Sequence, residues 1–162
     1  NRLAEIYKVD FNTTTPYINV TFVSTGHDNT IWIFNQDLQR LELYDYKTRS
    51  SRTQKVPVQS TVLDLKSDFN YCWLLTEKFI YVYNYFGRLV RKIDNSGYTS
   101  IIQNNENLIL KKENSLYYLK KNTDDVTQIK TPNLLINAFF VTNETLYIYN
   151  NETLLQFQLK IN

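Results

Sequence analysis

The chain has 162 residues, of which 43% are hydrophobic and 15% aromatic, and its formal net charge is +2. This composition excludes a disordered chain, because there is enough apolar surface to build a core. The small net charge argues against a dedicated nucleic-acid-binding protein, which usually carries a marked basic excess. No apolar run approaches the roughly 20 residues that span a bilayer, so we expect no transmembrane segment.

The residue types point to short strands joined by tight turns. The chain holds 13 Tyr, 9 Phe and 19 Asn, against 3 Gly and 3 Pro. Aromatic and β-branched residues suit a pleated, half-buried surface, and Asn suits turns. Helical periodicity is nearly absent along the chain. We therefore predict an all-β fold.

The first segment, residues 1–11, resembles a later one. "NRLAEIYKVD" at 1–10 matches "GRLVRKID" at 87–94 in its Arg-Leu pair and in its aliphatic residue followed by Asp. The later segment is the fourth strand of a repeated unit. Residues 1–11 are therefore predicted to be the fourth strand of a blade whose first three strands do not precede it.

The rest of the chain consists of four repeats of about 40 residues. The first, 17–58, has strands expected at 18–24, 30–34, 40–46 and 53–58. The second, 59–94, has strands at 61–66, 71–77, 78–85 and 88–94. The third, 97–130, has strands at 99–103, 107–112, 113–121 and 125–130. The fourth, 133–162, has three, at 134–141, 145–151 and 152–160.

Four short strands per unit at this period are typical of a β-propeller blade. Phe79–Phe86 carries apolar side chains on both faces of the expected strand. A sheet with one face in water would alternate between apolar and polar residues, whereas a blade lies between two neighbours. The whole chain is thus predicted to be a single β-propeller domain.

The sequence allows three ways in which these blades form a complete propeller. Residues 3–10 pair with 154–159 and close a four-blade ring, or the chain is part of a larger propeller of six to eight blades. Alternatively, two half-rings associate into one full ring, which buries the exposed blade faces.

"NTIWIFN" at 29–35 and "ETLYIYNN" at 144–151 resemble propeller repeats of secreted bacterial proteins of uncharacterised function. "LELYDY" at 41–46 and "SDFNYCWLL" at 67–75 strengthen the resemblance. The pattern departs from WD-repeat and kelch proteins, since it has no Trp-Asp dipeptide and no paired glycines. The resemblance implies an exported protein that is periplasmic, outer-membrane associated or extracellular.

Catalytic motifs are scarce. His27 is the only histidine and lies in an expected turn, and Cys72, the only cysteine, lies in an expected strand. A hydrolytic triad needs a histidine beside its nucleophile, and His27 is expected to be a solvated turn residue instead. A zinc site needs three or four ligands, more than one histidine and one cysteine supply, so we predict no metal and no cofactor. The acidic residues are scattered over turn positions, which leaves a glycosidase pair unplaced. They are Asp64, Asp68, Asp94, Asp124, Asp125 and Glu144.

The chain also contains two lysine pairs and several glycosylation sequons. Lys111-Lys112 and Lys120-Lys121 flank a hairpin and are expected to be a solvated edge, with a basic patch as the alternative. Four N-x-[ST] sequons occur and are expected to be chance matches. They begin at Asn12, Asn19, Asn143 and Asn151.

A propeller usually binds its ligand with loops above the central channel. The fourth-to-first loops place Tyr17, Gln59, Tyr98 and Asn133 at equivalent positions, where aromatic and amide side chains suit peptide or sugar contacts. The alternative is that these residues merely start strands.

We predict a non-enzymatic binding or scaffold module of the bacterial envelope, with a protein partner and peripheral association with a membrane complex. The alternative is a carbohydrate-active enzyme or lectin-like propeller with its site at the channel mouth. A nucleic-acid role would need a basic face around Lys111 and Lys121, and we predict no nucleic-acid partner.

Overall fold

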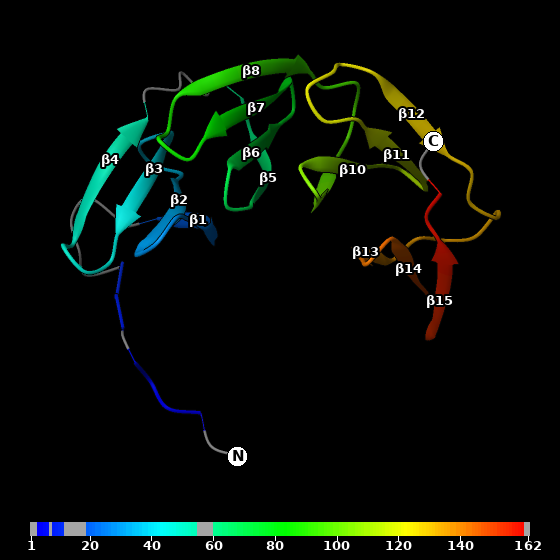
Figure 1. Cartoon of the computed structure of the whole chain (residues 1–162), viewed down its shortest axis with the longest axis horizontal. Helices are drawn as coiled ribbons and strands as arrows, with labels where there is room; N and C mark the ends of the chain where they lie inside the picture. Colours follow the sequence, from blue (N-terminus) through cyan, green and yellow to red (C-terminus); the bar gives the residue numbers. More distant parts are fainter. Residues whose placement is uncertain (1–2, 7, 12–18, 55–59, 161–162) are drawn as a thin grey trace.

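The computed structural model describes residues 3–6, 8–11, 19–54 and 60–160 (Figure 1). These residues form fifteen strands, which confirms the all-β prediction. Among them there is no helix of the length and apolarity needed to cross a membrane. The strands are β1 Val20–Thr25, β2 Thr30–Asn35, β3 Arg40–Asp45, β4 Ser50–Gln54, β5 Val62–Ser67, β6 Tyr71–Thr76, β7 Phe79–Asn84, β8 Leu89–Asp94, β9 Ser100–Asn104, β10 Asn107–Lys112, β11 Ser115–Leu119, β12 Val126–Ile129, β13 Ala138–Thr142, β14 Thr145–Asn150 and β15 Thr153–Gln158.

The strands make four antiparallel sheets in which neighbours in sequence are neighbours in space. The sheets are β1–β4, β5–β8, β9–β12 and β13–β15, and we call them blades 1 to 4. Each blade is a meander, so each of its strands leads into the next through a hairpin. The described part of blade 4 contains three strands, and the other three blades contain four.

Asn-Glu pairs form several of the hairpin turns. Asn105-Glu106, Asn143-Glu144 and Asn151-Glu152 have positive φ at both residues, between 41° and 71°. Two consecutive left-handed residues make the type I′ turn, whose twist matches that of the strands it joins. Asn adopts this conformation readily, and Glu takes the place that glycine usually fills.

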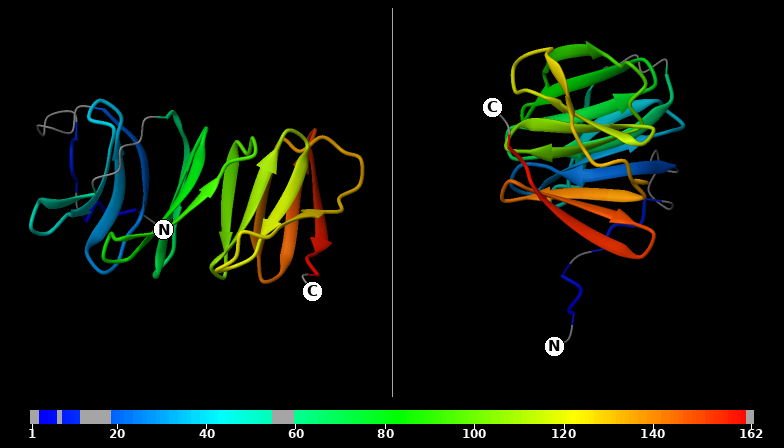
Figure 2. Two further views of the ribbon diagram at one scale, coloured as in Figure 1. Left: turned by 90° about the horizontal axis from the view of Figure 1, so that it is seen from above. Right: turned by 90° about the vertical axis from the view of Figure 1, so that its right-hand side faces the viewer.

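The blades stand side by side in an arc (Figures 1 and 2). The first strands lie on the inside of the arc, where β1 neighbours β5, β5 neighbours β9, and β9 neighbours β13. The fourth strands β4, β8 and β12 lie on the outside. This is the arrangement of consecutive propeller blades around a channel.

The core lies between the blades. Trp32 and Phe34 of blade 1 pack against Leu74 and Tyr83 of blade 2, and similar apolar clusters join blades 2 and 3 and blades 3 and 4. Because each inner blade contributes apolar side chains from both faces, the strands have the two-sided apolar pattern expected of a blade.

The four blades do not close into a ring (Figure 1). The described residues of segment 1–11 belong to no strand, and the side chains of Leu3 and Ile6 are fully exposed. β15 pairs with β14 alone among the described strands. Residues 3–10 therefore do not complete blade 4 of the same chain, and their assignment as a fourth strand stays a prediction.

Most strands begin within two residues of the predicted position, and two begin three or four residues away from it. β4 begins at Ser50 rather than at residue 53, and residues 55–58 of the expected strand lie outside the described residues. β13 begins at Ala138 rather than at residue 134. The reason lies in Asn114, whose side chain donates a hydrogen bond to the Leu134 carbonyl and accepts one from the Ile136 amide. These bonds hold the segment against blade 3 before it can pair with β14.

Candidate functional site

One end of the blades carries the first-to-second and the third-to-fourth strand turns, because alternate turns of a meander lie at opposite ends. We call this end the turn face. It includes the β5–β6 turn at 68–70, the β9–β10 turn at 105–106 and the β7–β8 turn at 85–88. The fourth-to-first loops, where the sequence predicted a ligand site, lie at the other end.

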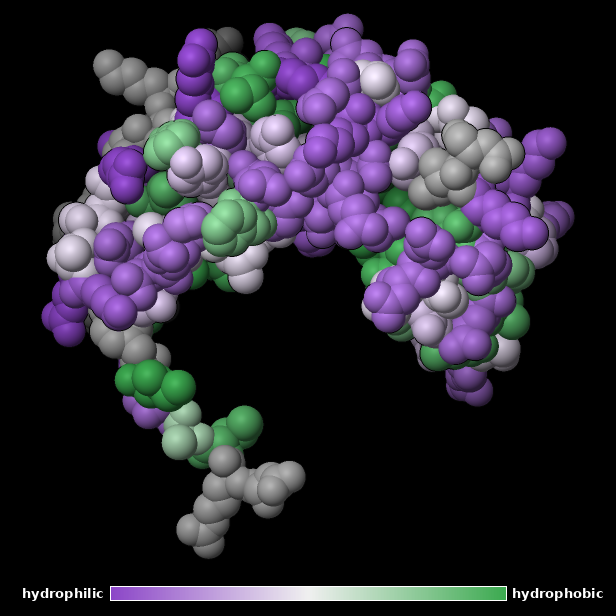
Figure 3. All heavy atoms as spheres, viewed as in Figure 1, coloured by the Kyte–Doolittle hydropathy of each residue, from purple (hydrophilic) through white to green (hydrophobic). Residues whose placement is uncertain are grey.

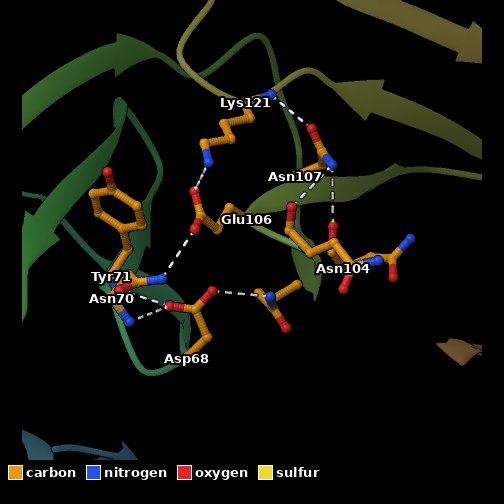
Figure 4. A network of polar contacts seen from close by, with 9 residues as sticks. Asp68, Asn70, Tyr71, Asn104, Glu106, Asn107 and Lys121 are labelled. Carbon is orange, nitrogen blue, oxygen red and sulfur yellow. Dashed lines mark hydrogen bonds and ion pairs between the residues drawn. The ribbon is translucent and has the colours of Figure 1, made fainter.

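Asp68 shapes the β5–β6 turn (Figure 4). Its Oδ1 accepts hydrogen bonds from the backbone amides of Asn70 and Tyr71, both at 2.8 Å. Its Oδ2 accepts a third from Gln103 Nε2 of blade 3, at 3.0 Å. A carboxylate that bonds backbone amides two and three residues ahead is a standard way to fix a turn. Asp68 therefore fixes both the turn and its position relative to blade 3.

Glu106 extends these contacts into a polar network between blades 2 and 3 (Figure 4). Its Oε1 accepts a hydrogen bond from Asn70 Nδ2 at 2.9 Å, and its Oε2 forms an ion pair with Lys121 Nζ. The hydrogen bond to Glu106 raises the pKa of Lys121, against a smaller opposing effect of burial. The Lys121 amide donates to Asn107 Oδ1 at 2.7 Å. A cavity of about 260 Å³ beside the network is lined by Trp73, among others.

An aromatic cluster lies on the same face, formed by His27, Phe69, Tyr85 and Phe86. The ring centroid of His27 lies 4.5 Å from that of Phe69 and 5.4 Å from that of Tyr85, and Tyr85 and Phe86 are 3.8 Å apart. Phe69 is 66% exposed and Phe86 is 60% exposed. Phe69 belongs to the turn that Asp68 holds, so the network and the cluster share one rigid element.

The described acids of the network are held by structural partners. Asp68 accepts three hydrogen bonds, and Glu106 pairs with Lys121 and Asn70. The described residues hold no group of three or more His, Cys, Asp or Glu side chains arranged for a metal ion. Burial raises the pKa of the Cys72 thiol well above its usual value, which keeps it as an unreactive thiol. The carboxylates of Asp68 and Glu106 thus hold neighbouring parts of blades 2 and 3 together.

The structure describes two of the four predicted ligand residues, and one of these two is buried. Tyr17 and Gln59 lie outside the described residues. Tyr98 is 6% exposed and packs edge-on against Tyr117, with ring centroids 5.4 Å apart. Asn133 is exposed on the segment before β13. Of the four, the structure thus describes only Tyr98 and Asn133, and a ligand surface over these loops stays a prediction.

Sequence reasoning missed the aromatic cluster. His27 lies in the turn where it was expected, but its side chain is 28% exposed and packs against rings from blade 2. The available signal was Phe69 inside the polar turn "SDFN" and Tyr85-Phe86 extending past the end of β7. Of the lysine pairs, Lys112 donates to the Ser96 carbonyl and Lys121 pairs with Glu106, so half of the expected solvated edge is engaged.

No family model matches the chain, and no curated protein matches it. Solved structures do. The extracellular domain of a one-component system from B. thetaiotaomicron is 10% identical at a TM-score of 0.71, over 93% of this chain and 22% of that one. BamB from Moraxella catarrhalis is 13% identical at a TM-score of 0.62, over 88% and 51%. PorZ of Porphyromonas gingivalis is 17% identical at a TM-score of 0.59, over 87% and 20%.

These similarities show the fold, since BamB and PorZ are β-propeller-like proteins and every identity is low. The chain spans about half the length of BamB and about a fifth of the other two. A lyase of streptogramin B is also similar, at 16% identity and a TM-score of 0.62. The propeller-like fold is thus shared with both enzymes and non-enzymes.

Proposed function

We propose that this chain is a non-enzymatic binding module of the bacterial cell envelope and that it holds a protein partner on its turn face. The observation that carries the proposal is the exposed aromatic cluster beside a fixed polar network. Aromatic side chains supply much of the binding energy in protein interfaces, and polar groups around them give specificity. Pre-organisation by Asp68 lowers the entropy lost when a partner docks on Phe69.

The envelope location is supported by the similar structures, at low identity. PorZ is described as a bacterial surface component of the type-IX secretion system, and another similar structure is an extracellular domain. We propose that this chain likewise acts in the periplasm, at the outer membrane or outside the cell, in peripheral association with a membrane complex. The same comparisons support a protein partner, because BamB and PorZ are components of complexes.

Carbohydrate binding is the alternative, and one observation favours it. The rings of Phe69 and Phe86 are exposed next to amide and carboxylate groups, which is the chemistry that sugar rings stack on and hydrogen-bond to. Lectin-like binding on the turn face would need no catalytic acid. Hydrolysis would need a second carboxylate at a defined distance, and Asp68 and Glu106 are both held by other groups.

The test is affinity capture from envelope extracts with wild-type protein, the variant Phe69→Ala/Phe86→Ala, and the control Leu38→Ala. Leu38 is 42% exposed in the β2–β3 turn, at the opposite end of the blades. We expect a protein captured by wild type and the control and lost, by about tenfold or more, with the double variant. Equal capture by all three proteins would contradict the proposal. Binding to a glycan array that the double variant loses would support the lectin alternative instead.

A further inference from the structure

The outer edge of β15 is an open strand position. In blades 1 to 3 the third strand pairs with a fourth, whereas β15 pairs with β14 alone among the described strands. A groove of about 580 Å³ runs between this edge and β12 of blade 3. Its apolar lining comes from Ile129, Leu146, Phe157 and Leu159. A fourth strand of blade 4 would lie in this groove.

Leu154 shows what the open position leaves exposed. It is the second residue of its strand, as are Leu41, Ile80 and Leu116 in the third strands of the other blades. All three equivalents are 0% exposed, whereas Leu154 is 54% exposed. Phe140 and Tyr149 on the same face of blade 4 are also about half exposed. The open edge thus adjoins an apolar face with no neighbouring blade.

The other end of the arc has the complementary feature. Val9 packs against Ile33 and Tyr44 on the outer face of blade 1. Ile33 is the fourth residue of a second strand and Tyr44 the fifth residue of a third strand.

In blade 3 those two positions are Leu110 and Leu119, and Ile93 of β8 lies with them in one apolar cluster. Ile93 belongs to the fourth strand of the preceding blade. Val9 therefore lies on blade 1 where the fourth strand of a preceding blade would place a side chain. The local sequences agree, since "KVD" at 8–10 matches "KID" at 92–94.

We propose that residues 3–10 of one copy of this chain pair antiparallel with β15 of a second copy, and that two copies close in this way into a ring of eight blades. Eight blades lie within the range that propellers adopt, and the two-fold arrangement satisfies both open ends at once. The pairing leaves neither chain with an unpaired edge at β15.

The register follows from the other blades. Ile93 lies opposite Ile80, and Ile129 lies opposite Leu116. The same register puts Val9 opposite Leu154, and three residues earlier it puts Ile6 opposite Phe157. Side chains three apart on a strand point to opposite faces. Val9 thus keeps its contact with blade 1 of its own copy, while Ile6 enters the groove of the second. Ile6, fully exposed in the single chain, becomes buried there. Figure 3 shows the N-terminal segment projecting from the blades with apolar side chains in the open.

The first measurement is mass in solution by analytical ultracentrifugation over a range of concentrations. We expect the wild-type chain at twice its monomer mass of 19.3 kDa. Ile6→Pro removes a backbone donor from the pairing strand without touching a contact of the single chain. Leu154→Asp places a charge in the closed interface. Both variants are expected to sediment at monomer mass with unchanged circular dichroism, and the control Leu38→Asp is expected to stay at twice that mass.

The second measurement is disulfide trapping, which identifies the strands that pair. Val9→Cys and Leu154→Cys chains are mixed and oxidised, while native Cys72 stays unreactive because it is fully buried. Opposed residues in an antiparallel pair are close enough for a disulfide. We expect a covalent dimer from this mixture, and about tenfold less from Val9→Cys mixed with Leu155→Cys, whose side chain lies on the other face.

Three results would overturn the proposal. The first is a wild-type chain that stays at monomer mass, or that forms assemblies larger than two copies. The second is a mixture of the single-cysteine chains that gives no covalent dimer. The third is the doubly substituted Val9→Cys/Leu154→Cys chain becoming cross-linked within one copy, which would mean that four blades close by themselves.

Discussion

Replacing Asp68 tests whether one carboxylate holds the turn face together. Asp68→Ala removes two backbone bonds of 2.8 Å and the bond from Gln103 Nε2 at 3.0 Å. A carboxylate bonded to turn amides behaves like a helix N-cap, whose loss costs about 1–2 kcal/mol. The bond from Gln103 adds about 1 kcal/mol. We expect the free energy of unfolding to fall by about 2–3 kcal/mol.

Asp68→Asn separates the geometry of the turn from its charge. The asparagine Oδ1 can still accept both amides, and Gln103 can rotate its side-chain amide to accept from the new Nδ2. The expected cost is therefore smaller, about 1 kcal/mol. A matched control is Asp124→Ala, which removes an ion pair to Arg91 from a side chain that is 76% exposed. Exposed pairs of this kind contribute little.

The assay is urea denaturation, combined with hydrogen exchange at the amides of Asn70 and Tyr71. With a slope of about 2 kcal/mol per M, the Asp68→Ala midpoint should fall by about 1 M. Exchange at the two amides should accelerate in Asp68→Ala and stay slow in Asp68→Asn. If Asp68→Ala costs no more than Asp124→Ala, or if Asn is as damaging as Ala, then Asp68 does not hold the turn in the way described.

Three further predictions concern the core and the turns. Tyr83→Phe should stabilise the protein by about 1 kcal/mol, because the buried Tyr83 hydroxyl has no hydrogen-bond partner among the described residues. Burial also raises the pKa of Tyr83 above its usual value of 10, so its contribution to stability is present below pH 10 and is lost as the pH rises further. Urea midpoints at about pH 8 and pH 11 should therefore differ less in Tyr83→Phe than in wild type; an equal difference would argue against this. Cys72 should react with a thiol reagent about a hundredfold more slowly in the folded protein than in urea, and rapid reaction of the folded form would contradict its burial. Glu152→Gly should raise the melting temperature, because Glu152 has a φ of 71°. Glu106 has a φ of 65°, but Glu106→Gly should raise the melting temperature less, because it also removes the contacts with Asn70 and Lys121. Equal rises in melting temperature would mean that those contacts do not stabilise the fold.

Strands and hairpins were predictable because each repeat carries strong local signals. β10 begins and ends where "NLILKK" predicted it, and the Asn-Glu turns follow the strands they were expected to end. The start of β13 was not predictable, because Asn114 binds the preceding segment from another blade. Such a contact links positions about 20 residues apart and leaves no trace in a local pattern.

The candidate site was harder to predict for a related reason. Aromatic residues at 85–86 continue the apolar run of β7, so the sequence pattern does not separate the exposed rings from the strand. Asp68 and Glu106 are 38 positions apart and are linked through Asn70 only because equivalent turns of adjacent blades lie side by side. Conversely, Tyr98 has the residue type of a ligand contact, yet its place at the start of a strand buries it against Tyr117.

Blade 4, at one end of the arc, can be compared with what repeat proteins need at their ends. Repeat proteins need a polar outer face on their terminal repeats to stay dispersed in water. Blade 4 instead presents Phe140, Tyr149 and Leu154, each about half exposed. Burying the remaining half of such a side chain stabilises by about 1 kcal/mol, so each closed contact gains about 3 kcal/mol from these three alone. A ring of two copies contains two such contacts, and strand pairing adds to both. The open arc is therefore expected to be the less stable form wherever a second copy is present.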